Sequence, residues 1–543
     1  MNVKKKILND LTVALEKSGF DKALAEIAYP PDDRLGDYST AVALKLKRAV
    51  DNQSPMEIAK VIEANWPKST YISSTKIESP GFINISLSND FLQESIRKIV
   101  EEGEKYGTSE VGKGKKARVE FISANPTGPL HIGNARGGPI GDTLANVLES
   151  SGFDTLREYL NNDCGNQVLE LGRTLATKAG FIEEKMADLV YQGDYINDLA
   201  KAVKVRVGDV KGLSKEEIIK KSGEIGVKTL FEEIVKDIKE IGIEYNKVYH
   251  ESDLQKKLPG VLRDLESKKL LKKQEGAIWF APRNEFLKDK DAVVIKSDGS
   301  YTYFGSDIVY HQEKFESGYD LIIDVFGSNT AGHVPKLKAL VSSLGFNLER
   351  FKVILYQFVR VKRGKDVVKM SKRAGNFVTA KEVLDEVGKD AFRFFMLMNQ
   401  PSTHMDFDLD QAKNKSADNP VYYVQYAHAR AGSILRKSQI DFSNANLKLI
   451  KEKPELRLIR KIIKLPELVE DISQNFAVHL LASYSIEVAD LFHKFYEEIQ
   501  VVSEDVELTK ARLSLVSAIK ITLANSLRLM GVSSPETMEK SGV

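Results

Sequence analysis

Short apolar runs bounded by turn or charged residues alternate with helical stretches through the middle of the chain. Runs of this kind predict strands at residues 117–123, 155–160, 292–296, 320–326 and 351–361. A helical segment from about residue 134 to residue 150 follows the first run. Strands that alternate with helices favour a parallel, doubly wound sheet, so we expect this region to be α/β.

The same pattern predicts an insertion within the α/β region. From about residue 170 to residue 271 the chain is mostly helical and rich in Lys and Glu. We therefore expect a helical unit inserted between the early and late strands of the sheet.

The two ends of the chain follow different patterns. Near the N-terminus, helices are predicted at 3–18, 55–64 and 90–103, and strands at 75–77 and 82–86, with a Ser-Pro-Gly turn between the strands. From about residue 419 only helical periodicity is found, with helices predicted at 456–471, 477–498 and 509–530. Three domains are expected: an α+β domain at 1–108, an α/β domain at 109–418 and an all-α domain at 419–543.

Composition narrows the class of protein. Of the 543 residues, 42% are hydrophobic and 29% are charged, as in ordinary globular proteins. No apolar run reaches the roughly 20 residues of a membrane span, and no signal peptide is apparent. The single cysteine, Cys164, excludes an internal disulfide and argues against a Cys-based zinc site. It fits a reducing cytoplasm, and it fits other compartments as well. The net charge of +2 argues against a globally basic surface but leaves room for a local nucleic-acid site.

A turn rich in Gly and Pro follows the first predicted strand. Residues 126–134 read Pro-Thr-Gly-Pro-Leu-His-Ile-Gly-Asn and lead into a helix. Gly128 and Gly133 allow close approach of a ligand to the backbone, and the start of a helix favours phosphate. His131 and Asn134 add hydrogen-bond donors. The alternative interpretation is a strand–helix turn that merely uses Pro and Gly.

A second segment, residues 369–373, reads Lys-Met-Ser-Lys-Arg and follows the last predicted strand. Lys369 and Lys372 are mobile point charges, which suit a phosphate that changes position during a reaction. Taken alone, such a loop is more often solvated surface.

Together and in this order, the two segments resemble the paired signatures of class I aminoacyl-tRNA synthetases. The resemblance implies that they form two halves of an ATP site, with catalytic roles for His131, Asn134, Lys369 and Lys372. This chain has Asn134 where the family usually has its second His, and an amide donates but carries no positive charge. The ATP-binding residues implied are Pro126, Thr127, Gly128, His131, Gly133, Asn134, Met370, Ser371 and Lys372.

Acidic residues elsewhere suggest that the second substrate is cationic. Glu120 lies within the first predicted strand, where a buried carboxylate is costly unless a cation such as the substrate pairs with it. Tyr303 and Asp307 are four residues apart, which places both on one face of a helix. A ring and a carboxylate suit a guanidinium group. The alternative is a cap or turn Asp beside a core Tyr.

The residues around these positions narrow the resemblance to arginyl-tRNA synthetases. The strand Glu-Phe-Ile-Ser-Ala-Asn at 120–125, the stretch Asn-Asp-Cys-Gly-Asn-Gln at 162–167 and the Tyr-x-x-x-Asp motif at 303–307 are similar to segments of that family. The arginine-binding residues implied are Glu120, Asn125, Tyr303 and Asp307.

The resemblance extends to both ends of the chain. The residues around Gly36-Asp-Tyr and 79–84 resemble the family's N-terminal domain, which is associated with the tRNA elbow. Residues 419–430 resemble the first helix of its anticodon-binding domain, where rings and donors suit unpaired bases. The alternative is a core helix with a polar edge. The tRNA-binding residues implied are Tyr422, Tyr423, Tyr426, His428 and Arg430.

The family implies a two-step reaction. Arginine and ATP, with Mg²⁺, give arginyl-adenylate and pyrophosphate, and the arginyl group then passes to tRNA-Arg, which must be bound before the adenylate forms efficiently. A monomer in the cytoplasm, with no membrane partner and no resident metal, is expected. A class I synthetase for glutamate or cysteine is one alternative, which Glu120, Asp307 and the single cysteine disfavour. A non-catalytic RNA-binding paralogue is another, which the retained lysines and His131 disfavour.

Overall fold

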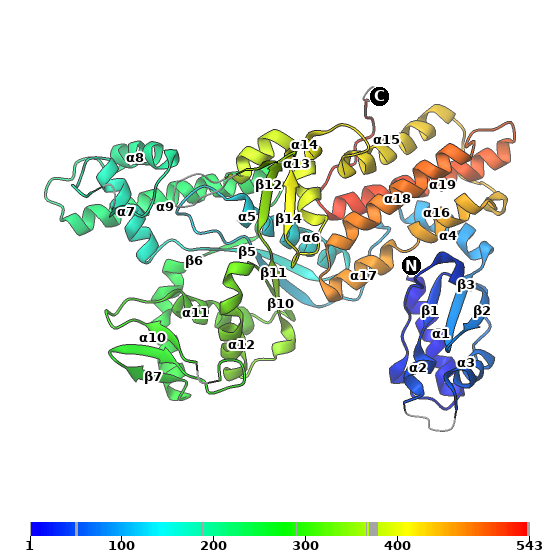
Figure 1. Cartoon of the computed structure of the whole chain (residues 1–543), viewed down its shortest axis with the longest axis horizontal. Coiled ribbons are helices and arrows are strands. Elements are labelled where there is room, and N and C mark those ends of the chain that lie inside the picture. Colours follow the sequence, from blue (N-terminus) through cyan, green and yellow to red (C-terminus); the bar gives the residue numbers. More distant parts are fainter. Residues whose placement is uncertain are drawn as a thin grey trace.

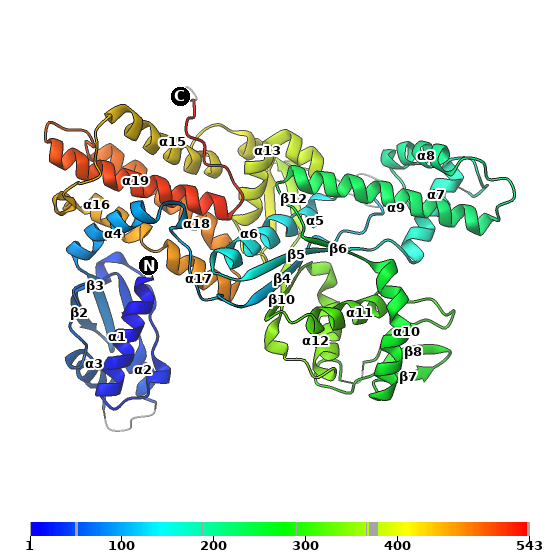
Figure 2. The same cartoon turned by 180° about the vertical axis from the view of Figure 1, so that it is seen from behind.

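The computed structural model describes residues 2–48, 53–185, 188–288, 290–364, 366–368 and 378–539. The molecule is elongated, with an α/β region in the middle (Figure 1). A helical arm extends from one end of this region, and the C-terminal helices and the N-terminal domain lie at the other end. Figure 2 shows the same arrangement from behind, with the arm and the N-terminal domain far apart.

The central sheet is parallel and doubly wound, as predicted. Its strand order is β11-β10-β4-β5-β6, so that the first strand in the chain, β4, lies in the middle. The chain moves outward from β4 in one direction and then from β10 in the other, which is the order of a Rossmann-like fold. The strands are β4 (Lys116–Phe121), β5 (Asp154–Asn161), β6 (Lys247–His250), β10 (Leu321–Gly327) and β11 (Phe351–Tyr356).

The helix after β4 packs closely on the sheet. The predicted segment 134–150 is two helices, α5 (Ile132–Ala135) and α6 (Gly137–Ser150), which meet at Arg136. A Cβ atom at Gly141 would lie 2.3 Å from the ring of Phe121, so only glycine allows α6 to come this near to β4. The close packing fixes where the chain enters the helix, and therefore where the preceding turn lies.

Two strand predictions are wrong in their sheet assignment. The run 292–296 forms β9 (Ala292–Ile295) in a separate antiparallel sheet with β7 (Leu271–Gln274) and β8 (Ala277–Phe280). In this sheet a two-residue turn joins β7 to β8, and β9 pairs with β8. The run 351–361 is interrupted at Gln357, whose N–H donates to the Pro401 carbonyl. After this break the chain enters another sheet, made of β12 (Val359–Arg363), β13 (Asp366–Val367) and β14 (Met405–Asp408).

The helical insertion is confirmed, but it ends earlier than predicted. Its arm consists of α7 (Asn166–Lys178), α8 (Asp194–Val207) and α9 (Lys215–Glu240), which share a small core that includes Leu171, Leu199 and Leu230. The chain then returns to the central sheet as β6, which has only four residues and mixed polarity. A strand this short gives no apolar run, which is why the sequence did not predict it. Helices α10 (Glu251–Ser267), α11 (Tyr303–Glu316) and α12 (Val334–Ser343) follow.

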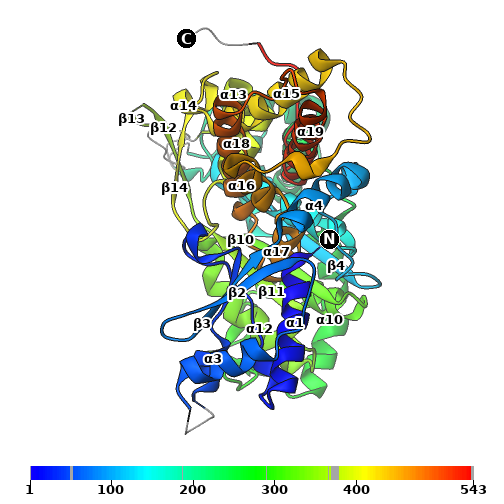
Figure 3. The same ribbon diagram turned by 90° about the vertical axis from the view of Figure 1, so that its right-hand side faces the viewer.

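The N-terminal domain has the α+β architecture that the pattern predicted. Its antiparallel sheet has the order β1-β3-β2 and lies below the C-terminal helices in Figure 3. A capping box at Ser54 and Glu57 starts α3 at Pro55, as predicted. The elements are α1 (Val3–Lys17), β1 (Tyr38–Thr40), α2 (Val42–Leu46), α3 (Pro55–Ala64), β2 (Ile72–Glu78) and β3 (Phe82–Leu87).

The C-terminal region is helical, as predicted, and α4 (Asn89–Glu102) packs against two of its helices, α16 and α19. One helix was predicted for 456–471, but the chain forms α16 and α17, with Pro466 in the first turn of α17 because proline lacks an N–H. The helices from residue 380 onward are α13 (Ala380–Leu397), α14 (Leu409–Lys413), α15 (Pro420–Ser438), α16 (Lys453–Ile462), α17 (Leu465–Asn475), α18 (His479–Glu498) and α19 (Val506–Leu529). Within the described ranges, every helix is too short or too polar to span a bilayer.

Candidate active site

The carboxyl ends of β4 and β10 form the switch point of the sheet, where the chain winds in opposite directions. Ligands of doubly wound folds bind in the crevice outside such strand ends. The residues after β4 lead through Asn125 to His131, and the 3₁₀ segment Ser328–His333 follows β10. The first predicted half of the ATP site therefore lies where this type of sheet binds ligands.

His131 is held in place by its own helix. It is the N-cap of α5, and its Nδ1 accepts a hydrogen bond from the Gly133 N–H at 2.9 Å. Because Nδ1 accepts, we assign the ring proton to Nε2, which makes Nε2 a donor. The Asn134 carbonyl accepts from the Tyr356 hydroxyl at 3.2 Å, which ties the same turn to the end of β11.

Residues 378–380, a few positions after the second predicted segment, are hydrogen-bonded to residues 130–132 of the first predicted segment. The Ile132 N–H donates to the Val378 carbonyl at 3.1 Å, and the Ala380 N–H donates to the Leu130 carbonyl at 2.7 Å. These two bonds flank a bridge between His131 and Thr379. Lys369, Met370, Ser371 and Lys372 lie outside the described residues, so their predicted roles stay predictions.

Asn125 links the strand end to the stretch 162–167. Its amide donates to Gln167 Oε1 at 3.0 Å, and its carbonyl oxygen accepts from the Asn162 amide at 2.5 Å. The backbone just before it is unusual, since Ile122 and Ser123 have φ values of 66° and 39°. The left-handed region is rare for residues other than glycine and marks a constrained turn.

Tyr303 and Asp307 lie on the first turns of α11, as their spacing predicted. The Thr302 side chain caps this helix by accepting from the Gly305 N–H. Tyr303 is 39% exposed, and one Asp307 carboxylate oxygen lies 3.7 Å from Nδ1 of His333, which follows β10. Sequence reasoning did not single out His333, although it closes the segment after that strand.

A buried carboxyl lies beneath this helix. Glu251, the first residue of α10, is 2% exposed and accepts from the Ser306 hydroxyl at 2.8 Å. Burial raises the pKa of Glu251 to about 7, and the negative charge of Asp307 adds to the shift. Burial likewise raises the pKa of the Cys164 thiol, and the charge of Glu251 adds to it, so this cysteine stays protonated at neutral pH.

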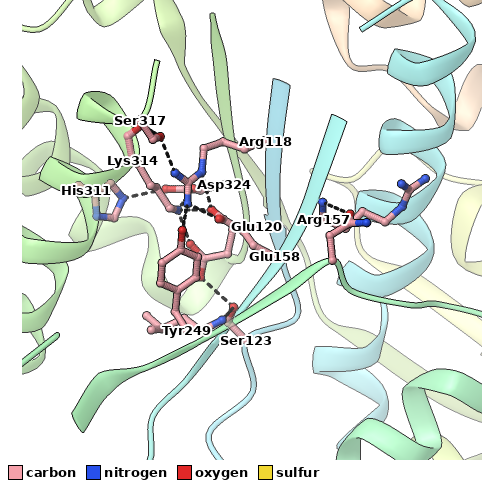
Figure 4. A network of polar contacts seen from close by, with 12 residues as sticks. Arg118, Glu120, Ser123, Arg157, Glu158, Tyr249, His311, Lys314, Ser317 and Asp324 are labelled. Carbon is pink, nitrogen blue, oxygen red and sulfur yellow. Dashed lines mark hydrogen bonds and ion pairs between the residues drawn. The ribbon is translucent and has the colours of Figure 1, made fainter. Parts of the chain in front are cut away.

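Glu120 already has a cationic partner within the protein, whereas the sequence led us to expect the substrate to supply one. It is 2% exposed, and Lys314 Nζ from α11 lies 2.5 Å from its Oε2 (Figure 4). The Ser123 hydroxyl donates to its other oxygen at 2.8 Å. Burial raises the pKa of Glu120, and Lys314 opposes the shift. A residue 194 positions away supplies the charge, and no local pattern could have predicted that pairing.

The helical arm also reaches the crevice. The Tyr195 hydroxyl donates to the Thr127 carbonyl at 3.0 Å. A Cβ atom at Gly128 would lie 3.5 Å from the same hydroxyl, which is ordinary contact. Tyr195 comes from α8, so its place beside the turn had no signal in the sequence.

The predicted RNA-binding helix, α15, carries a row of rings. Tyr422 and Tyr426 stack with centroids 6.2 Å apart, Tyr426 stacks on His493 at 6.0 Å, and the Arg430 guanidinium lies 4.4 Å from the Tyr496 centroid. Tyr423 tilts against the same histidine.

His428 is not part of this row. It is 2% exposed, its Nδ1 donates to the Pro535 carbonyl, and burial lowers its pKa, so it is not available to an RNA base. We remove His428 from the candidate interface.

Comparisons with known proteins cover nearly the whole chain. The family model of the class I (R) tRNA synthetase catalytic domain matches residues 95–434, and that of the arginyl-tRNA synthetase N-terminal domain matches residues 2–87. The DALR anticodon-binding domain model matches residues 424–538. An arginine–tRNA ligase of Dehalococcoides mccartyi is 39% identical over 553 residues, covering 99% of each chain.

The chain belongs to the arginyl-tRNA synthetase family. Solved structures agree with this assignment. A putative arginyl-tRNA synthetase of Campylobacter jejuni matches with a TM-score of 0.75 and 31% identity, covering 83% of this chain and 100% of that one. The Thermus thermophilus arginyl-tRNA synthetase shares the fold, with a TM-score of 0.81 at 20% identity, covering 98% and 100% of the two chains.

Membership of the arginyl-tRNA synthetase family confirms the predicted fold class, which combines a Rossmann-like catalytic region, an α+β N-terminal domain and a helical C-terminal region. Across the described residues, no three His, Cys, Asp or Glu side chains gather in a way that could hold a metal ion.

Proposed function

We propose that this chain catalyses the arginine–tRNA ligase reaction at the crevice between β4 and β10. The observation that carries the proposal is the bonding of residues 130–132 to residues 378–380. Through it, the turn that contains His131 and the chain that follows Lys372 meet at the switch point of the sheet. We propose that the two segments, which are far apart in sequence, both reach one ATP molecule there.

The proposed chemistry needs no side-chain nucleophile. The arginine carboxylate attacks the α-phosphate of ATP, the bond to pyrophosphate breaks, and a terminal ribose hydroxyl of tRNA-Arg then takes the arginyl group from AMP. Catalysis consists of positioning and charge stabilisation. His131 donates to phosphate oxygens through Nε2, Asn134 donates through its amide, and Lys369 and Lys372 neutralise the departing pyrophosphate.

Mg²⁺ is proposed to arrive with ATP. It prefers oxygen ligands, whereas His131 and Asn134 offer an imidazole and an amide, which suit phosphate oxygens. When bound, Mg²⁺ neutralises charge on the phosphates.

Arginine is proposed to bind beside α11. Tyr303 and Asp307 lie at the start of this helix, and a half-exposed ring with a carboxylate one turn away suits a guanidinium. Asn125 is proposed to contact the α-amino or carboxylate end of the amino acid from the end of β4. Direct contact between Glu120 and arginine stays a prediction.

The tRNA is proposed to lie along the C-terminal helices and the N-terminal domain. Unpaired anticodon bases would stack on Tyr422, Tyr423 and Tyr426 and meet Arg430. The division at residues 108 and 418 also remains a proposal, as do a monomeric state and a cytoplasmic location.

Aminoacylation tests the proposed function directly. Purified protein, ATP, Mg²⁺ and tRNA-Arg are mixed with each of the twenty labelled amino acids, and acid-precipitable counts are measured. We expect charging with arginine alone. Charging with another amino acid, or none with any amino acid by a folded protein, would exclude the proposal.

A further inference from the structure

Three buried carboxylates form a row across the central sheet. The row consists of Asp324 of β10, Glu120 of β4 and Glu158 of β5, which lie opposite one another on adjacent strands. All three are at most 2% exposed. Like charges this close are costly in a buried place unless cations neutralise them. The row therefore requires cations from within the protein.

Lys314 of α11 reaches all three carboxylates. Its Nζ lies 2.5 Å from Glu120, 2.6 Å from Asp324 and 3.4 Å from Glu158. Arg118 adds a bidentate pair with Glu158 (Figure 4). Lys314 and Arg118 thus face three carboxyl groups.

His311 contacts the row at Asp324. Its Nε2 lies 2.9 Å from Asp324 Oδ2, and its Nδ1 lies 2.8 Å from the Asp307 backbone carbonyl. Burial alone would raise the pKa of Asp324, but Lys314 and His311 outweigh it and lower that pKa to about 2, so the carboxyl is ionised. Because the Asp307 carbonyl can only accept, we assign a proton to Nδ1 of His311. All three carboxyl groups are thus held by side chains of the protein itself, without a ligand.

The buried cluster touches the proposed arginine site at two points. At one end, Glu120 accepts from Ser123, inside the left-handed turn that precedes Asn125. Such backbone persists only where the surroundings hold it. At the other end, His311 donates to the carbonyl of Asp307 itself.

We propose that Lys314 and His311 are positioning residues for arginine: through Glu120–Ser123 and through the Asp307 carbonyl, the buried cluster fixes Asn125 and Asp307 relative to each other. The proposal rests on the proposed function and adds that the arginine pocket is set before arginine binds. Lys314 and His311 are 0% and 2% exposed, so neither touches the substrate.

Two serine variants form a matched pair for testing this role. Ser123→Ala removes the hydroxyl that ties Glu120 to the turn. Ser317→Ala removes a hydroxyl that accepts from Arg118 at 2.9 Å, at the far end of the same cluster. In ATP–pyrophosphate exchange with tRNA-Arg present, we expect Ser123→Ala to raise KM for arginine about tenfold, as for loss of a hydrogen bond to a charged group, with KM for ATP within twofold. Ser317→Ala should change neither constant by more than twofold.

His311→Asn separates positioning from contact, because the side chain it replaces is buried away from any ligand. It should raise KM for arginine while KM for ATP stays within twofold. Thermal melting is measured alongside, and if this variant does not fold, the serine pair alone decides. Equal changes in the arginine and ATP constants, or equal effects of the two serine variants, would overturn the inference while leaving the proposed function intact. Absence of arginine-dependent exchange in the parent protein would instead remove the proposed function, and the inference with it.

Discussion

The Ala380 N–H donates to the Leu130 carbonyl at 2.7 Å, and this bond joins residues 250 positions apart. It places the start of α13 beside the turn that carries His131. Lys372 stands eight positions before Ala380 in the sequence and lies outside the described residues. The contact brings the described chain after Lys372 next to the residues proposed to hold the triphosphate.

Lys372→Ala should cripple adenylate formation without unfolding the protein. The change removes a charge aimed at departing pyrophosphate, and loss of one preorganised donor of this kind costs about 3–4 kcal/mol in the transition state. The rate of ATP–pyrophosphate exchange should fall by roughly two to three orders of magnitude. Lys381→Ala is the control, because Lys381 is already paired with Glu240 and Asp385. Near-parental exchange by the Lys372 variant would remove the loop from the mechanism.

Asp307→Asn should raise KM for arginine far more than KM for ATP. The amide keeps the shape of the carboxylate but loses the charge that pairs with guanidinium, and a charge-assisted hydrogen bond contributes about 1.5–3 kcal/mol. We expect an increase of roughly 10- to 100-fold for arginine. Glu313→Gln on the same helix is the control, since Glu313 pairs with Lys257 at the surface. A parallel rise in both constants would make Asp307 a structural residue.

Several elements could be predicted because their signals are local. Ser54, Pro55 and Glu57 specify the start of α3, and the period of four places Tyr303 with Asp307. By contrast, the partner of Glu120 is Lys314, which comes from a helix 194 residues later and meets it only after the sheet has formed. Burial of a carboxylate was predictable, whereas the source of its counter-charge was not.

The prediction for His428 failed for a different reason. On α15 the residues Val421, Val424 and Gln425 form the buried stripe, and His428 follows them at helical spacing. Its polarity suggested an exposed role, but the period of the helix places it inward. Helical phase was the better guide than residue type.

Replacing Tyr426 and Arg430 together with Ala should weaken tRNA-Arg binding. Stacking on an unpaired base contributes about 1–3 kcal/mol, so the dissociation constant should rise by one or two orders of magnitude. Filter binding measures this, with Arg436→Ala as the control, because Arg436 lies on the same helix but is paired with Glu536 from the segment after α19. If the double variant melts like the parent and binds tRNA equally well, α15 does not read the anticodon.

Glu251→Gln should stabilise the protein more at pH 8 than at pH 5. Burial raises the pKa of Glu251 from 4.5 to about 7, so the folded protein holds this proton more tightly than the unfolded chain does. Stability is therefore lost as pH rises from about 4.5 to about 7, by on the order of 3 kcal/mol. Glutamine does not titrate and can still accept from Ser306.

Thermal or urea unfolding at the two pH values measures the effect. Asp253→Asn, on the exposed side of α10, is the control and should show no such gain. A stability difference for Glu251→Gln that is the same at pH 5 and pH 8 would contradict the raised pKa.

ATP–pyrophosphate exchange with and without tRNA-Arg is the most direct test of the proposed function. A single series compares arginine with lysine, glutamate and cysteine. We predict exchange that depends on arginine and rises strongly when tRNA-Arg is added, with background rates for the other amino acids. Exchange driven by another amino acid, or no exchange by the folded protein even with arginine and tRNA-Arg, would contradict the account.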